Sequence, residues 1–129
     1  MRDVFHSDCP GRQVLGHLTG RWTVLVLAAL QPGPRRYHEL RRTIEGISDK
    51  MLTATLRVLV DDNLLTRTVI PGSPPQVSYA LTELGRGASD ALGPLLDWIR
   101  EHAEQIIGSP TAPSGTGLPR AQVGDEVIG

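Results

Sequence analysis

The chain has 129 residues, of which 40% are hydrophobic and 21% charged, values that fit one domain with a buried core. Its net charge of −1 hides an asymmetry: residues 1–67 carry ten Arg and Lys against seven Asp and Glu, whereas residues 68–129 carry three against seven. A single cysteine excludes an internal disulfide and a metal site made of several cysteines, and the longest apolar run, 24–30, is too short to span a membrane. We therefore expect a cytoplasmic protein without a secretion leader or membrane contact, whose basic half is able to face phosphate groups.

The first part of the chain is predicted to be helical. A short helix is expected over 11–18, where Pro10 suits the helix start. A second helix is expected over 21–30, and because it is apolar on nearly all sides it should be buried. The run Gln31-Pro32-Gly33-Pro34 ends it.

A third, short helix is predicted over 37–43. Tyr37, Leu40 and Ile44 recur at helical spacing and indicate its buried side. Gly46 then breaks the pattern, so a tight turn should join this helix to the next.

The fourth helix is predicted over 49–62. Ser48 is a good N-cap, and Asp49 suits the positive end of the helix dipole. Asn63 tolerates the left-handed conformation that commonly follows a helix, so the helix should stop there.

A β-hairpin and a last helix complete the predicted elements. β-branched and aromatic residues predict strands over 65–70 and 76–81, joined by a Pro- and Gly-rich turn. A final helix should reach from 83 to 107, with a kink or break at Pro94. The segment 108–129 is rich in Gly, Pro, Ser and Thr, and we expect a disordered tail.

The fourth predicted helix has two different sides at 100° per residue. One side is mainly apolar and carries Met51, Leu52, Thr55, Leu56 and Leu59. The opposite side carries Lys50, Thr53, Ala54 and Arg57. Slim residues allow close approach to a DNA groove and donors suit base edges and phosphates, so this side has the composition of a major-groove reader. An ordinary solvated helix face with one Lys and one Arg would show the same pattern.

Four arginines precede this helix, at Arg35, Arg36, Arg41 and Arg42. They are either contacts to phosphates beside the groove or plain solvated charges. The hairpin tip carries no Lys or Arg, and Arg67 is its nearest cation, so a minor-groove contact by the hairpin is the weaker expectation.

Several motifs resemble those of the HxlR-type regulators, a branch related to MarR-like bacterial transcription factors. The resemblance covers about residues 9–105. It is carried by Cys9-Pro10, Gly20-Arg21-Trp22-Thr23, Arg36-Tyr37-His38-Glu39-Leu40-Arg41-Arg42, Gly46-Ile47-Ser48-Asp49-Lys50-Met51-Leu52, Leu56-Arg57-Val58-Leu59, Pro74 to Gly85, and Pro94 with Trp98. It implies a mainly α, winged helix-turn-helix fold and a homodimer formed by the N-terminal and C-terminal helices. The two reading helices of such a dimer address a pseudo-palindromic operator in double-stranded DNA.

These expectations define the domain organisation and the candidate site. The winged helix-turn-helix domain is expected over 1–107, with the helix-turn-helix over 37–62, the wing over 65–81 and dimerisation helices over 10–18 and 83–107. The candidate DNA-binding residues are Arg36, Arg41, Arg42, Ser48, Lys50, Thr53, Ala54, Arg57 and Gln76. The candidate dimer-interface residues are Leu92, Leu95, Leu96, Trp98 and Ile99.

Cys9 is a candidate redox-sensing residue. It precedes a predicted helix start, where the helix dipole favours the thiolate, and some members of the family that the chain resembles sense oxidants or electrophiles through a cysteine here. The resemblance therefore implies a small-molecule or oxidant effector, and the alternative is a thiol that only packs against its neighbours. His6 and Cys9 are spaced like half of a metal site, but a second pair is missing and no metal is expected.

Three classes of function compete. A DNA-binding transcription regulator accounts for the polar side of the fourth helix and for the resemblance. A winged helix that serves as a protein-interaction module would need an apolar side there, and Lys50, Thr53 and Arg57 argue against it. An enzyme and a bound cofactor are not expected, because the sequence offers no paired carboxylates, no nucleophile with a base and no phosphate-binding loop.

Overall fold

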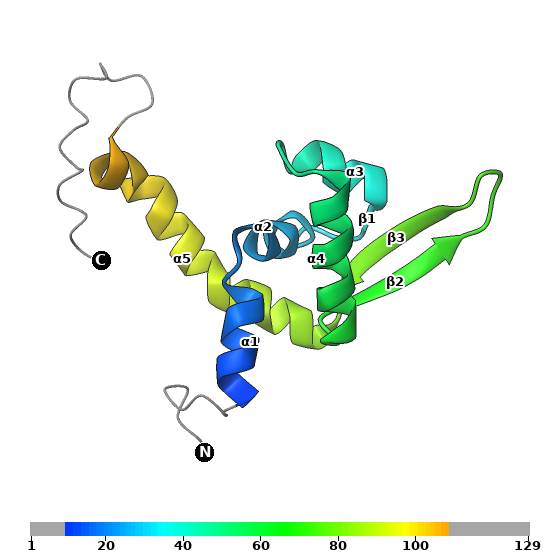
Figure 1. The fold of residues 1–129 in the computed structure, drawn as a ribbon, viewed down its shortest axis with the longest axis horizontal. Helices are drawn as coiled ribbons and strands as arrows, with labels where there is room; N and C mark the ends of the chain where they lie inside the picture. The colour runs from blue at the N-terminus through cyan, green and yellow to red at the C-terminus, as the bar shows by residue number, and fades with distance from the viewer. Residues whose placement is uncertain (1–9, 109–129) are drawn as a thin grey trace. The chain divides into compact units, whose positions relative to one another are not determined.

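The structure is a computed structural model that describes residues 10–108, and it divides into two compact units at the Leu92–Gly93 peptide. Figure 1 shows the order of the elements. They are α1 (Pro10–Leu18), α2 (Arg21–Ala29), β1 (Arg35–Arg36), α3 (Tyr37–Thr43), α4 (Asp49–Asp61), β2 (Leu65–Ile70), β3 (Gln76–Leu81) and α5 (Glu83–Ile107). The first unit is a winged helix and includes the start of α5, whereas the second contains the rest of α5.

The core of the first unit lies where α2, α3 and α4 meet the base of the hairpin. Its largest fully buried side chains are apolar, namely Val26, Leu27, Leu30, Leu40, Leu52, Leu56 and Leu59. α2 supplies Val26 and Leu27, as its nearly uniform apolar sequence predicts. In Figure 1, α3 lies by the N-terminal end of α4, and the hairpin leaves from the C-terminal end. The core thus holds α4 from one side and leaves its other side open.

A three-stranded antiparallel sheet forms the wing, with the strand order β1-β3-β2. The hairpin was predicted with these bounds, and Leu65 pairs with Leu81 at its base while Ile70 pairs with Gln76 near its tip. β1 was not predicted, because two consecutive arginines show no strand pattern. Its pairing with Ser78 and Tyr79 joins the residues just before α3 to the wing.

Two observations on α5 bear on the predictions. The helix continues through Pro94, so a break there is wrong, whereas a kink at Pro94 stays a prediction. A proline removes one backbone donor and crowds one carbonyl, and neighbouring turns can hold the helix together around it. Leu92 is half-buried and packs against the core of the winged unit, and its place in a dimer interface stays a prediction.

The second unit is described from Gly93 to Gly108 and is helical as far as Ile107. It carries a row of exposed apolar side chains, in which Leu95 and Trp98 are each 50% exposed. The ring of His102 stacks on that of Trp98, with 4.7 Å between their centroids. Within residues 10–108, no helix has the length and apolar content that crossing a membrane requires.

The base of the wing is closed by a junction between Leu64 and the start of α5. The backbone N–H of Thr82 donates to the carbonyl oxygen of Leu64 at 3.0 Å. The hydroxyl of Thr82 donates to the carbonyl of Asn63 at 2.8 Å and accepts from the N–H of Gly85 at 2.9 Å. Asn63 adopts the predicted left-handed conformation, with φ 65°. Strand pairing and helix capping therefore meet at one point.

Gly85 permits this junction, and its replacement should destabilise the fold. A Cβ atom there would lie 2.0 Å from the carbonyl oxygen of Leu64, which belongs to the backbone and cannot rotate away. We expect Gly85→Ala to lower the free energy of unfolding by about 2–3 kcal/mol, in the upper part of the range for overpacked sites. Urea denaturation followed by circular dichroism measures this change.

Gly87 in the same helix provides the matched control, because a Cβ there would meet no atom within 4 Å. Gly87→Ala should leave stability unchanged or raise it by up to about 1 kcal/mol through helix propensity. Equal unfolding midpoints for the two variants would contradict the steric role of Gly85.

Candidate nucleic-acid interface

The open side of α4 carries the four residues that the sequence placed there. Lys50, Thr53, Ala54 and Arg57 are all exposed. The opposite side packs into the core through Leu52, Thr55, Leu56 and Leu59, as predicted. Met51 was expected on this inner side and is instead 41% exposed. It lies at the flank of the buried arc, seven residues or about two turns before Val58, which is also exposed.

Ser48 is committed to the helix start. Its Oγ accepts from the backbone N–H of Met51 at 3.1 Å, which is the N-cap contact expected from the sequence. The residue thereby sets where α4 begins. Its hydroxyl proton is the group that remains for a contact outside the protein.

Tyr37, Arg41 and Asp49 form a polar cluster that ties α3 to the first turns of α4. A guanidinium nitrogen of Arg41 donates to a carboxylate oxygen of Asp49 at 2.7 Å. The hydroxyl of Tyr37 donates to the same Asp49 oxygen at 2.8 Å and lies 3.3 Å from the hydroxyl of Thr53. Arg41 was predicted as a phosphate contact, and in the structure an acidic partner holds its charge.

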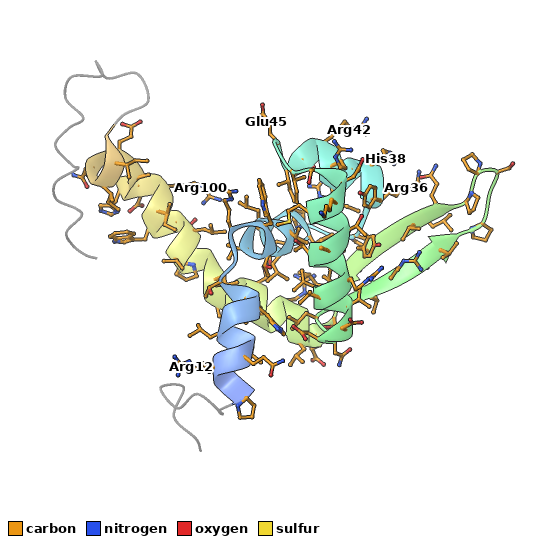
Figure 2. All side chains as sticks on the ribbon, viewed as in Figure 1. Arg12, Arg36, His38, Arg42, Glu45 and Arg100 are labelled. Atoms are coloured by element: carbon orange, nitrogen blue, oxygen red, sulfur yellow. The ribbon has the colours of Figure 1, made fainter. Side chains whose placement is uncertain are left out.

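The other arginines near α3 differ in their environments. Arg35 donates to the carbonyl oxygen of Ala29 at 2.6 Å, so this charge serves the end of α2. Arg36 donates to the side-chain oxygen of Gln76 at 3.2 Å, which joins two candidate residues across β1 and β3. The backbone N–H of Arg36 donates to Glu39, and this hydrogen bond holds the pKa of the Glu39 carboxyl below its ordinary value. Figure 2 shows Arg36, His38 and Arg42 grouped at α3.

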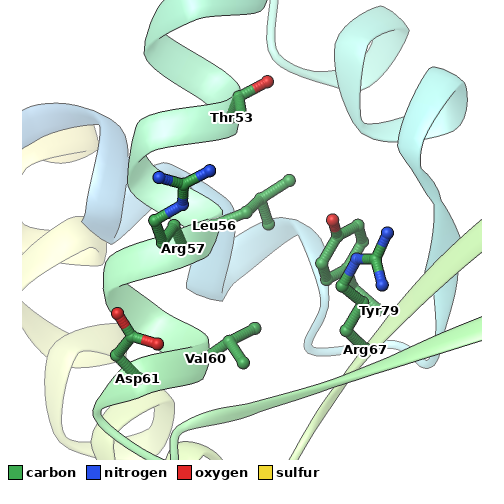
Figure 3. A pocket seen from close by; sticks show the side chains of 7 residues that line it. All are labelled: Thr53, Leu56, Arg57, Val60, Asp61, Arg67 and Tyr79. Carbon is green, nitrogen blue, oxygen red and sulfur yellow. The ribbon is translucent and has the colours of Figure 1, made fainter.

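A hollow of about 310 Å³ separates α4 from the wing. Figure 3 shows Arg57 on the α4 side and Arg67 on the β2 side, with Leu56 and Tyr79 between them. The lining is completed by Thr53, Val60 and Asp61. A second hollow of about 500 Å³, between the start of α3 and the wing, also includes Arg67. Arg67 therefore lines both hollows, the one between α4 and the wing and the one between α3 and the wing.

Four cations of this surface have no hydrogen bond or ion pair with any residue in the described range 10–108. They are Arg42, Lys50, Arg57 and Arg67. A cation without an internal partner is available to a phosphate or a base edge. Arg41 differs, because its guanidinium already donates to Asp49. Arg67 was not among the DNA-binding residues predicted from the sequence. The signal was present in the hairpin register, because Arg67 pairs with Tyr79 and must share its side of the sheet.

The remaining candidates lie elsewhere. Leu95, Leu96, Trp98 and Ile99 belong to the second unit, where all but the half-buried Leu96 are exposed. Cys9 and the tail beyond Gly108 lie outside the described residues. In the part of the chain from 10 to 108, no three His, Cys, Asp or Glu side chains gather as metal ligands would.

Comparison with known proteins relates this chain to helix-turn-helix transcriptional regulators. The sequence matches the HxlR-like helix-turn-helix family over residues 17–107. It is 43% identical over 105 residues to the HTH-type transcriptional regulator YtfH of Escherichia coli (strain K12), covering 81% of this chain and 83% of that protein.

Solved structures agree with the sequence matches. The chain resembles the structure of ytfH from Salmonella typhimurium with a TM-score of 0.77 and 43% identity, covering 82% of this chain and 95% of that one. It also resembles the redox regulator HypR in its oxidized form, with a TM-score of 0.66 and 32% identity over 72% of this chain and 96% of that one. The proteins to which the chain is similar are transcriptional regulators and not enzymes.

Proposed function

Because the chain belongs to the HxlR-like helix-turn-helix family and is an HTH-type transcriptional regulator, we propose that it acts in the cytoplasm by binding double-stranded operator DNA sequence-specifically as a homodimer. α4 enters the major groove, and the cations of α3 and the wing contact the flanking phosphates. Two α4 helices related by a two-fold axis address half-sites about one helical turn apart.

The observation that carries this proposal is the open side of α4. It presents Lys50, Thr53, Ala54 and Arg57 together, and within residues 10–108 neither cation is paired. The small side chain of Ala54 permits close approach, whereas Lys50 and Arg57 can donate to guanine or to phosphate. A protein-interaction module would bury an apolar surface here, and the exposed Met51 and Val58 lie only at the flank.

The direct test is selection of bound sequences from a pool of random double-stranded DNA. The expected result is a pseudo-palindrome that the protein binds at least about 1000-fold more tightly than random DNA at physiological salt. Equal affinity for selected and random DNA would overturn sequence-specific binding.

The two kinds of contact predict different mutant phenotypes. Arg57→Ala should weaken binding to the selected site by about 1–3 kcal/mol and relax the preference at one base pair in each half-site. Arg42→Ala should weaken binding to all sequences alike and reduce the slope of log affinity against log salt by about one unit per subunit. Fluorescence anisotropy at several salt concentrations measures both effects.

Arg86→Ala is the matched control, because Arg86 is an exposed arginine of α5 whose side chain contacts the carbonyl oxygen of Gln31. It should leave both the affinity and the salt slope unchanged. If Arg57→Ala reduced binding to selected and random DNA equally, Arg57 would be a phosphate contact and not a base reader.

Dimerisation is proposed to use the apolar row of the second unit. Leu95, Trp98, Ile99 and Ile106 recur at spacings of three, four and seven residues, so they share one face of the helix. All four are exposed. Exposed apolar side chains that form a continuous row on one helix are typical of an interface. Val14 and Leu15 of α1 are exposed in the same way and are further candidates for this contact.

A charge on this row should separate the subunits. Sedimentation at micromolar concentration should give about twice the chain mass of 14.0 kDa for the wild type and a monomer for Ile99→Glu. Glu104 is exposed on the opposite face of the helix, so Glu104→Ala should remain a dimer. A monomeric wild type would contradict the proposal.

We also propose control through Cys9, on the basis of the resemblance to HypR, which is a redox regulator by name. With one cysteine in each chain, the available products are a disulfide between subunits or a thiol capped by a small molecule. Cys9→Ser should bind the selected operator normally but lose the response to diamide. Unchanged affinity of the wild type after complete modification of Cys9 would assign the thiol a structural role.

A further inference from the structure

Among the candidate DNA-binding residues of α4, Thr53 is the one whose hydrogen-bonding role the described structure constrains. Its hydroxyl is exposed on the open side of α4 and lies 3.3 Å from the hydroxyl of Tyr37. The Tyr37 hydroxyl in turn lies 2.8 Å from Asp49, and Asp49 is held by Arg41 at 2.7 Å. The four side chains form a continuous series of hydrogen bonds, which starts at the Arg41 guanidinium and ends at the open side of α4.

The direction of each hydrogen bond follows from the groups involved. A guanidinium can only donate, and an ionised carboxylate can only accept. The single proton of the Tyr37 hydroxyl must therefore be donated to Asp49, since that bond is the shorter and is assisted by charge. The Tyr37 oxygen keeps only lone pairs, so the Thr53 hydroxyl must donate its own proton to Tyr37.

The protonation of Tyr37 supports this direction. Burial raises the pKa of the Tyr37 phenol above its ordinary value, and the neighbouring Asp49 acts in the same sense, although the Thr53 contact opposes it. The phenol consequently remains a donor at any pH at which the protein would bind DNA.

From this series of hydrogen bonds we infer that the Thr53 hydroxyl presents only an acceptor to the major groove. Thr53 therefore selects a base with an amino group, adenine or cytosine, on the strand that it reads. The exocyclic amino groups of adenine and cytosine are donors in this groove, whereas the corresponding oxygens of thymine and guanine are acceptors. A threonine hydroxyl without such a partner could pair with either an amino group or an oxygen of a base, because it can rotate to donate its proton as well as accept one. Tyr37, Arg41 and Asp49 act as positioning residues that remove this freedom.

The inference rests on the proposed DNA binding, and the experiment separates the two. Sequences bound by the wild type, Thr53→Val and Tyr37→Phe are selected from the same random pool. Thr53→Val keeps the shape but has no acceptor, so it identifies the base position that depends on Thr53. We expect adenine or cytosine at that position for the wild type. An adenine there replaced by purine, which lacks the 6-amino group, should weaken wild-type binding by about 2- to 10-fold, as for one neutral hydrogen bond.

Tyr37→Phe is the decisive variant. It removes the acceptor for the Thr53 proton but keeps the ring, so the amino-over-keto preference at this position should fall to within about twofold of unity while overall affinity for operator DNA persists. Thr53→Ser, which keeps the hydroxyl, should retain the wild-type preference. Thermal unfolding of each variant confirms that it folds.

Two outcomes would overturn the inference and leave the proposed function standing. One is a thymine or guanine preference at the position that depends on Thr53, and the other is specific binding in which no position depends on Thr53. An unaltered preference in a folded Tyr37→Phe variant would likewise exclude the positioning role. A wild type that binds no sequence above random DNA would instead refute the proposed function itself.

Discussion

The close approach of Gly85 to the carbonyl oxygen of Leu64 fixes the geometry on which the winged unit depends. α4 ends at Asp61, and only Asp62, Asn63 and Leu64 separate it from β2, so any displacement at Leu64 shifts the helix end and the wing together. The Leu64 carbonyl is also the acceptor for Thr82, where β3 passes into α5. A residue with a side chain at position 85 would push these segments apart. The angle between α4 and the wing is therefore set by a contact remote from the candidate interface.

The opposite end of α4 is fixed by polar contacts. Asp49 places a negative charge on a surface that is otherwise suited to phosphates, and Arg41 and Tyr37 both direct hydrogen bonds to it. Because Arg41 and Tyr37 belong to α3, the charge of Asp49 holds the two helices of the helix-turn-helix together. α4 is thus held by steric contact at one end and by charge at the other. Lys50 and Arg57, which have no partner among residues 10–108, face outward between these two ends.

The sequence predicted those features that depend on local pattern, and it failed where distant partners decide. Helical spacing identified α3 and the buried side of α4, and β-branched residues gave the hairpin with its observed bounds. The roles of Arg35, Arg36 and Arg41 depend on acceptors in α2, β3 and α4, which no local pattern specifies. The two-residue strand β1 is too short to show periodicity, and Met51 lies at the edge of the apolar arc, where a helical projection does not separate buried from exposed. Arg67 could have been found by pairing the hairpin strands.

The pairing of β1 with β3 has a mechanical consequence. Arg35 and Arg36 are hydrogen-bonded to the wing through Tyr79 and Ser78, and α3 begins at the next residue. The helix-turn-helix and the wing are thus continuous parts of one stiff body, and Arg36 adds a side-chain bond to Gln76. A duplex bound by such a body must adapt its own groove width to the fixed spacing between α4 and the wing. Base steps that bend or narrow at low energetic cost would then be favoured even where no side chain touches a base, and operator sequence would be read partly through DNA deformability.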